Sequence, residues 1–145
     1  MDWKREAVDK LKCYEAKRSS AERAEMEMRR LEGDMASIRS ATTDGTPVSG
    51  GSSTREDMLI NNIAHRDELK RAMQEAKAWV KIVESGLAVL DEEERLLLDR
   101  FFIHRAMGYV DRLCGELNLE KSRVYERKDM ALRHFTMALY GVTET

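Results

Sequence analysis

The positions of proline and glycine constrain the fold of this chain more than any other feature of its sequence. The one proline among the 145 residues, Pro47, lies in the run ATTDGTPVSGGSS at residues 41–53, and residues 1–40 contain a single glycine, Gly33. Clusters of these residues interrupt regular structure, whereas long stretches without them allow long helices. The sequence therefore predicts two long helical segments joined by a linker at about residues 41–53.

Apolar residues in both segments recur at the spacing of an amphipathic helix, mostly in steps of three or four. From Leu69 onward the steps alternate between four and three, as in a coiled coil. We expect the second helix to begin near Ser53 or Thr54, whose hydroxyl groups can cap it. The predicted buried stripes consist of Trp3, Ala7, Leu11, Tyr14, Ala21, Ala24, Met28, Leu31, Met35 and Ile38, and of Leu59, Ile63, Leu69, Met73, Ala76, Val80, Val83, Leu87 and Leu90.

Composition and spacing together predict an all-α fold whose first domain, residues 1–86, is an antiparallel helical hairpin resembling a coiled coil. Aromatic residues make up 6% of the chain and charged residues 36%, which favours long helices over a β core. One narrow apolar stripe per helix gives a thin core, and a partner chain often completes such a hairpin. The sequence thus predicts a homo-oligomer, with a dimer favoured.

Residues 87–145 form the second predicted domain, in which three shorter helices follow one another. Leu113 and Leu117 give the middle helix a buried face, and Asn118 suits the left-handed position of a tight turn. A short helix, a tight turn and a second, partly exposed helix make a helix-turn-helix, which can place its second helix in the major groove of DNA. The helices are expected at about residues 91–104, 109–117 and 120–140, divided by Gly86, Gly108, Gly115 and Asn118.

The last predicted helix combines an exposed polar side with a buried apolar side that consists of Val124, Ala131, Leu132 and Phe135. Lysine and arginine neutralise phosphates and donate to guanine, tyrosine can pack against a thymine methyl group, and glutamate can accept from a cytosine amino group. The sequence therefore predicts double-stranded DNA as a partner. The candidate DNA-binding residues are Arg112, Lys121, Ser122, Arg123, Tyr125, Glu126, Arg127 and Lys128.

Two stretches of this domain resemble region 4 of bacterial sigma factors. LDEEERLLLDRFF, at residues 90–102, is similar to the opening helix of that region, and ELNLEKSRVYERKDMALR, at residues 116–133, is similar to its turn and recognition helix. With its helical N-terminal part, its PVSGG linker and its terminal LYG, the whole chain resembles the phage-encoded RinA/ArpU group of late-gene activators.

The resemblance implies a sequence-specific transcription regulator that activates phage genes in the cytoplasm of a bacterial host, with or without contact to host RNA polymerase. It places Lys121, Ser122, Tyr125 and Glu126 where region 4 reads bases. Tyr125 and Glu126 stand where that region commonly has arginine and glutamine, so we expect a target other than the usual promoter element. No segment resembles those with which sigma factors melt DNA, and a complete sigma factor is not expected.

Other chemistries find little support in the sequence. The net charge is −2, so DNA binding must come from a local cluster of cations. His65, His104 and His134 lie too far apart for a local metal signature, and we expect no enzyme activity, metal or cofactor. Cys13 and Cys114 lack metal or redox spacing, and no signal peptide or membrane-length apolar run is seen, which fits a cytoplasmic protein.

Two other functions stay open as alternatives. A DNA-packaging protein similar to a small terminase subunit also joins a helix-turn-helix to an oligomerising helical part, and a ring of many subunits would favour it. A module that occupies the sigma-binding surface of RNA polymerase and inhibits the enzyme would bind polymerase without binding DNA.

Overall fold

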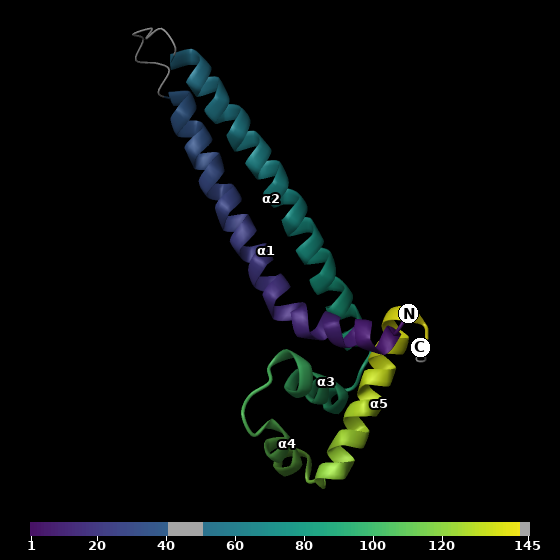
Figure 1. Ribbon diagram of the computed structural model, residues 1–145. Helices are drawn as coiled ribbons and strands as arrows, with labels where there is room; N and C mark the ends of the chain where they lie inside the picture. The colour runs from purple at the N-terminus through teal and green to yellow at the C-terminus, as the bar shows by residue number, and fades with distance from the viewer. Residues whose placement is uncertain (41–50, 143–145) are drawn as a thin grey trace. The chain divides into compact units, whose positions relative to one another are not determined.

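The computed structural model describes residues 1–40 and 51–142, and within these ranges the fold is all-α, as predicted, without any strand (Figure 1). The predicted linker at residues 41–53 lies mostly outside the described residues, but the second helix already begins at Gly51, before the predicted start. The elements are α1 (Trp3–Ser40), α2 (Gly51–Ala88), α3 (Glu92–Leu98), the π-helix η2 (Asp99–Ile103), α4 (Tyr109–Leu117) and α5 (Lys121–Tyr140).

The chain divides into two compact units. The terminal unit comprises Met1–Lys17 and Ala78–Thr145, and the paired-helix unit comprises Arg18–Lys77. This division differs from the predicted one after residue 86, because the first turns of α1 and the last turns of α2 belong with the helices that follow. The first turns of α1 and all of α5 therefore belong to the same unit.

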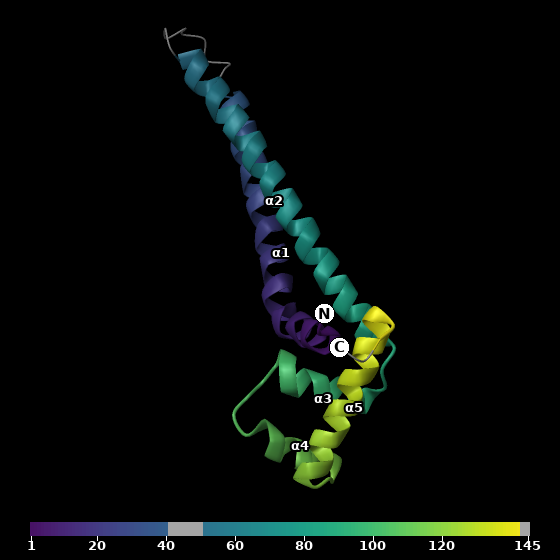
Figure 2. The same cartoon turned by 45° about the vertical axis from the view of Figure 1, so that its right-hand side comes forward.

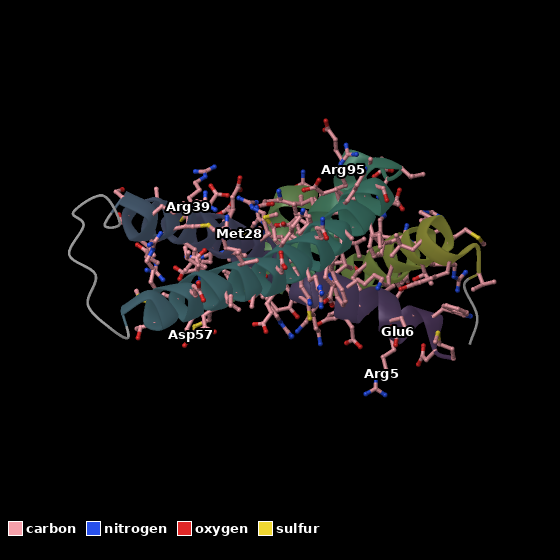
Figure 3. The ribbon with its side chains drawn as sticks, turned by 90° about the horizontal axis from the view of Figure 1, so that it is seen from above. Arg5, Glu6, Met28, Arg39, Asp57 and Arg95 are labelled. Carbon is pink, nitrogen blue, oxygen red and sulfur yellow. The ribbon has the colours of Figure 1, made fainter. Side chains whose placement is uncertain are left out.

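In the paired-helix unit, segments of α1 and α2 run side by side in opposite directions (Figures 1 and 2). Arg39, near the end of α1, and Asp57, near the start of α2, accordingly lie at the same end of this unit (Figure 3). Small side chains dominate the seam between the two segments, so few methylene groups are buried there. Among the described residues, the buried apolar ones of this unit are Ala21, Ala24, Leu31, Met35 and Ala76.

The buried stripe predicted for α2 is displaced near the start of the helix. Ile63 is 43% exposed, whereas its neighbour Asn62 is 6% exposed and donates a hydrogen bond from Nδ2 to the carbonyl oxygen of Leu31 at 2.8 Å. The prediction that Ile63 is buried is therefore wrong. Successive residues of an α-helix differ in direction by about 100°, so the burial of Asn62 turns Ile63 away from α1.

The core of the terminal unit joins the first turns of α1 to α2 and α5. Ala7 and Leu11 of α1, Val83 of α2 and Phe135 of α5 belong to one cluster and are completely buried. Gly86 lies inside α2 and does not end it, contrary to the prediction. A Cβ atom at Gly86 would lie 2.7 Å from Cε2 of Phe135, so the absence of a side chain permits the close approach of α2 and α5.

Both tryptophans of the chain pack within the terminal unit. The ring of Trp3 lies 4.9 Å from that of Tyr140, measured between centroids. Trp79 donates from Nε1 to the carbonyl oxygen of Lys10 at 3.1 Å, and the Nζ atom of Lys10 lies 4.4 Å from the centroid of the Trp79 ring. These contacts tie the start of α1 to the end of α2 and to α5.

The helix predicted at about residues 91–104 is divided in the structure. It begins with a capping box, in which Asp91 Oδ1 accepts from the N–H of Glu94 at 2.8 Å and Glu94 Oε1 accepts from the N–H of Asp91 at 3.4 Å. The α-helix α3 ends at Leu98, and η2 continues the chain to Ile103 with a wider turn. Phe101 of η2 is thereby buried beside α4 and α5.

Candidate nucleic-acid interface

A turn at residues 118–120 joins α4 to α5. Asn118 adopts the left-handed conformation predicted for it, with φ 54° and ψ 45°, and its N–H donates to the carbonyl oxygen of Cys114. Glu120 is extended and directly precedes the first turn of α5. The chain thus changes direction within a few residues, so that α4 packs against the start of α5.

A small apolar core holds α4 against α5. Leu113 of α4 and Val124 of α5 are completely buried, and they pack with Leu97 and Phe101 of the preceding helices. Leu119, within the turn, is partly buried against the same cluster. Because Val124 faces inward, its neighbours on the opposite side of α5 face outward.

The first part of α5 exposes most of the predicted DNA-binding residues. No side chain of a described residue caps its first turn, so the backbone N–H groups there add partial positive charge to the surface. Tyr125 is 39% exposed although its ring packs edge-on against Phe101, with 5.6 Å between centroids. The exposed residues are Lys121, Ser122, Arg123, Tyr125 and Glu126, together with Arg112 on α4.

The exposed cations differ in their partners. Arg123 Nη1 lies 3.3 Å from Glu126 Oε2, and both side chains are more than half exposed. Such an exposed pair adds little stability and opens readily toward a stronger partner. Lys121 and Arg112, by contrast, form no ion pair with any residue in the described ranges. Their charges are therefore available to an anion in solution.

Arg127 and Lys128 are held by other groups of the protein. Arg127 Nη1 donates to Glu93 Oε1 at 2.8 Å and to Glu93 Oε2 at 2.9 Å. Lys128 Nζ lies 2.7 Å from Asp129 Oδ1 and 5.3 Å from the centroid of the Phe101 ring, and its side chain is only 19% exposed. Sequence reasoning placed Lys128 on the exposed side of α5, but the structure buries much of it.

Glu93 is a residue of this site that the sequence did not reveal. It lies on α3, 34 positions before Arg127, and no spacing rule connects residues so far apart. The adjacent Glu94 also reaches α5, where its Oε2 atom is in hydrogen-bond contact with Nδ1 of His134. Two neighbouring carboxylates of α3 thus fix the position of α5 on the unit.

A histidine at the end of η2 lies between two carboxylates. His104 Nδ1 is 2.7 Å from Asp99 Oδ1, and His104 Nε2 is 3.2 Å from Glu15 Oε1 of α1. The hydrogen bond with Asp99 raises the pKa of His104 above its ordinary value, and the charges of Asp99 and Glu15 raise it further, while burial opposes the change. The imidazole therefore ties α1 to the segment that leads into α4, and its protonated form does so more strongly than its neutral form.

Residues 1–40 and 51–142 present neither a metal site nor a membrane span. Among them, no group of three or more His, Cys, Asp or Glu side chains is placed to hold a metal ion, and no helix combines the length and hydropathy of a membrane span. No protein-family model, curated protein or solved structure matches the chain. The geometry of α4 and α5 itself must therefore carry the functional interpretation.

Proposed function

We propose that this protein is a transcription regulator that binds double-stranded DNA in a sequence-specific manner, with α4 and α5 acting as a helix-turn-helix. The turn at Asn118 carries the proposal, because it packs α4 against α5 and leaves the outer side of the first part of α5 exposed. An α-helix is about 10–12 Å across with its side chains, which suits the major groove of about 12 Å.

The exposed residues divide by chemistry into two groups in this proposal. Lys121 and Arg112 contact phosphates, because no ion pair within the described residues neutralises them. Ser122, Tyr125 and Glu126 read base edges, since a hydroxyl, an aromatic ring and a carboxylate offer a donor, an apolar face and an acceptor. The phosphate contacts position the protein, and the base contacts select the sequence.

Arg127 and Lys128 have a different role from the one predicted for them. Glu93 holds Arg127, and the Phe101 ring and Asp129 hold Lys128. We assign both cations to the orientation of α5 and not to direct contact with DNA. A recognition helix fixed in this way loses less freedom on binding than a mobile one.

Few cations per copy are available for phosphates, so one copy alone has modest affinity. We therefore propose that two copies bind repeated half-sites, as dimeric helix-turn-helix proteins do. The resemblance to phage late-gene activators supplies the biological setting. In that setting the protein activates phage genes in a bacterial host, with or without contact to host RNA polymerase.

The test is a selection of binding sites from a random duplex pool, repeated at two salt concentrations with the purified protein. We expect a recovered sequence motif, repeated within each site, and an affinity that falls steeply with salt. Tyr125→Ala and Glu126→Ala should change the preferred sequence, while Lys121→Ala should weaken binding to all sequences. Lys81→Ala is the matched control, because Lys81 is an exposed lysine on α2. This substitution should change neither the preferred sequence nor the affinity.

Two other outcomes of the selection would overturn the proposal in different ways. Salt-sensitive binding without a motif, together with a ring of many subunits, would favour a DNA-packaging protein. No DNA binding at any salt concentration, together with capture of RNA polymerase, would favour a polymerase inhibitor. If Tyr125→Ala, Glu126→Ala and Lys121→Ala all leave the preferred sequence and the affinity unchanged, the protein binds a specific sequence but not through α5.

A further inference from the structure

The segment between η2 and α4 carries an arginine whose charge no carboxylate neutralises. Arg105 is exposed, and it forms no ion pair with any residue among 1–40 and 51–142. Its Nη2 atom donates to the hydroxyl oxygen of Tyr109 at 2.9 Å, and its Cζ atom lies 4.9 Å from the centroid of the Tyr109 ring. Because both contacts are with an uncharged side chain, the positive charge of Arg105 stays available to an anion.

The groups on either side of Arg105 are held by other parts of the terminal unit. The residue before it, His104, contacts two carboxylates through its ring nitrogens. The N–H of Tyr109 donates to the carbonyl oxygen of Ala106 at 3.2 Å, and the Tyr109 ring packs edge-on against the buried Phe101 with 5.0 Å between centroids. The guanidinium group is therefore placed before a ligand arrives, which lowers the entropy cost of binding.

A row of aromatic rings joins Arg105 to the exposed side of α5. Phe101, which contacts Tyr109, also contacts Tyr125 with 5.6 Å between centroids. The row from Tyr109 to Tyr125 thus has a length of the order of the major groove, which is about 12 Å wide. Arg112, three positions after Tyr109, lies on the same side of α4. When Tyr125 reaches a base inside the groove, the position of Arg105 therefore suits a phosphate at the edge of the groove.

We infer that Arg105 contacts a phosphate of the DNA duplex beside the groove that α5 enters, and that Tyr109 is the residue that positions it. The inference rests on the proposed function and adds a cation to the phosphate contacts of Lys121 and Arg112. A guanidinium group has five N–H donors. The Tyr109 hydroxyl accepts from one nitrogen of Arg105, so most of the donors remain for the oxygens of a phosphate.

Titration of the full chain with labelled duplexes over a range of salt concentrations tests the inference, with fluorescence anisotropy as the readout. One duplex has random sequence and the other is the duplex recovered by selection. We expect Arg105→Ala to lower the slope of log affinity against log salt concentration by about 1 on both duplexes. Arg105→Lys should keep the slope, because it keeps the charge. Arg71→Ala is the matched control, since Arg71 is an exposed arginine of the paired-helix unit, and it should leave the slope unchanged.

Tyr109→Phe separates the positioning of Arg105 from its contact with DNA. This variant keeps the ring and removes the hydroxyl group that accepts from Arg105. The slope should stay unchanged, because the charge of Arg105 remains. The affinity should fall by about two- to tenfold, since a less restrained side chain must then be ordered on binding. Circular dichroism should show that every variant stays helical.

Three results would overturn the inference, and they differ in what else they overturn. A natural protein that binds neither duplex would remove the proposed function as well. A lower slope in Lys121→Ala together with an unchanged slope in Arg105→Ala would remove the Arg105 contact alone. Equal losses of slope in Arg105→Lys and Arg105→Ala would show that substitution disturbs the segment before α4, because the lysine retains the charge.

Discussion

Gly86→Ala tests the packing of α2 against α5, which supports the whole terminal unit. The added Cβ atom would lie 2.7 Å from Cε2 of Phe135 and 2.9 Å from Cδ2 of Leu139. Carbon atoms in contact prefer about 3.5–4.0 Å. The Leu139 methyl group is the end of a flexible side chain, but the Phe135 ring is completely buried and has no free space into which it can turn.

Two opposing effects set the size of the change. Alanine is favoured over glycine inside a helix by about 0.8–1.0 kcal/mol, whereas overpacking a buried site costs about 1–3 kcal/mol. We therefore expect Gly86→Ala to destabilise the terminal unit by about 1 kcal/mol. Gly115→Ala in α4 is the matched control, because a Cβ atom at Gly115 meets nothing within 4 Å. Without a clash, this variant should gain up to about 1 kcal/mol from helix propensity.

Urea unfolding followed by tryptophan fluorescence measures both variants in the relevant part of the molecule, since both tryptophans pack in the terminal unit. We expect the unfolding midpoint to fall for Gly86→Ala and to rise for Gly115→Ala, with an unchanged dependence on urea. A rise of similar size for both variants would refute the reasoning, because it would mean that α2 and α5 adjust to a methyl group at no cost.

Three further predictions concern charged residues. If the Lys121 ammonium contacts one phosphate, Lys121→Ala should lower the slope of log affinity against log salt concentration by about 1 in DNA titrations. An unchanged slope would show that Lys121 does not contact a phosphate. Glu93→Gln should weaken DNA binding, because it leaves Arg127 without its ion pair. The free energy of unfolding in urea should fall by less than about 1 kcal/mol, since both side chains are partly exposed. Unchanged DNA binding would contradict the orienting role of the pair. The raised pKa of His104 means that its protonated form stabilises the fold fully below the unfolded pKa of about 6.5, and that this contribution is lost as pH rises through the folded pKa. His104→Gln should therefore flatten the decline in stability as the pH rises above about 6.5, an effect below about 1 kcal/mol for so exposed a group. An identical pH dependence in the variant would argue against the contact.

The features that sequence reasoning predicted depend on residues close together in the chain. The boundaries of α4 follow from its short apolar spacing, and Asn118 marks the turn because few other residues tolerate a positive φ. The inward side of α5 was also predicted, since Val124 and Phe135 keep one helical phase and are both completely buried. Local backbone preferences and a regular period are sufficient for such features.

The features that were missed depend on contacts between distant parts of the chain. In the sequence, Gly86 predicts the end of a helix. In the structure, its missing side chain leaves room for the Phe135 ring. Ile63 fits an apolar period better than Asn62, yet the hydrogen bond of Asn62 to α1 decides which of them is buried. The Glu93–Arg127 pair likewise needs the fold before it can be seen. A long-range partner can override a local preference of about the same size.

The number of copies on the DNA can be tested by titration with two kinds of duplex. Because few cations per copy are available to phosphates, tight binding to a repeated site needs two linked copies, whose second contact is made at high effective concentration. A duplex with two half-sites should therefore bind at least about tenfold more tightly than a duplex with a single half-site. Lys121→Ala should weaken binding to both duplexes, because it removes a phosphate contact from each copy. Equal affinity of the natural protein for the two duplexes would show that a single copy suffices for recognition.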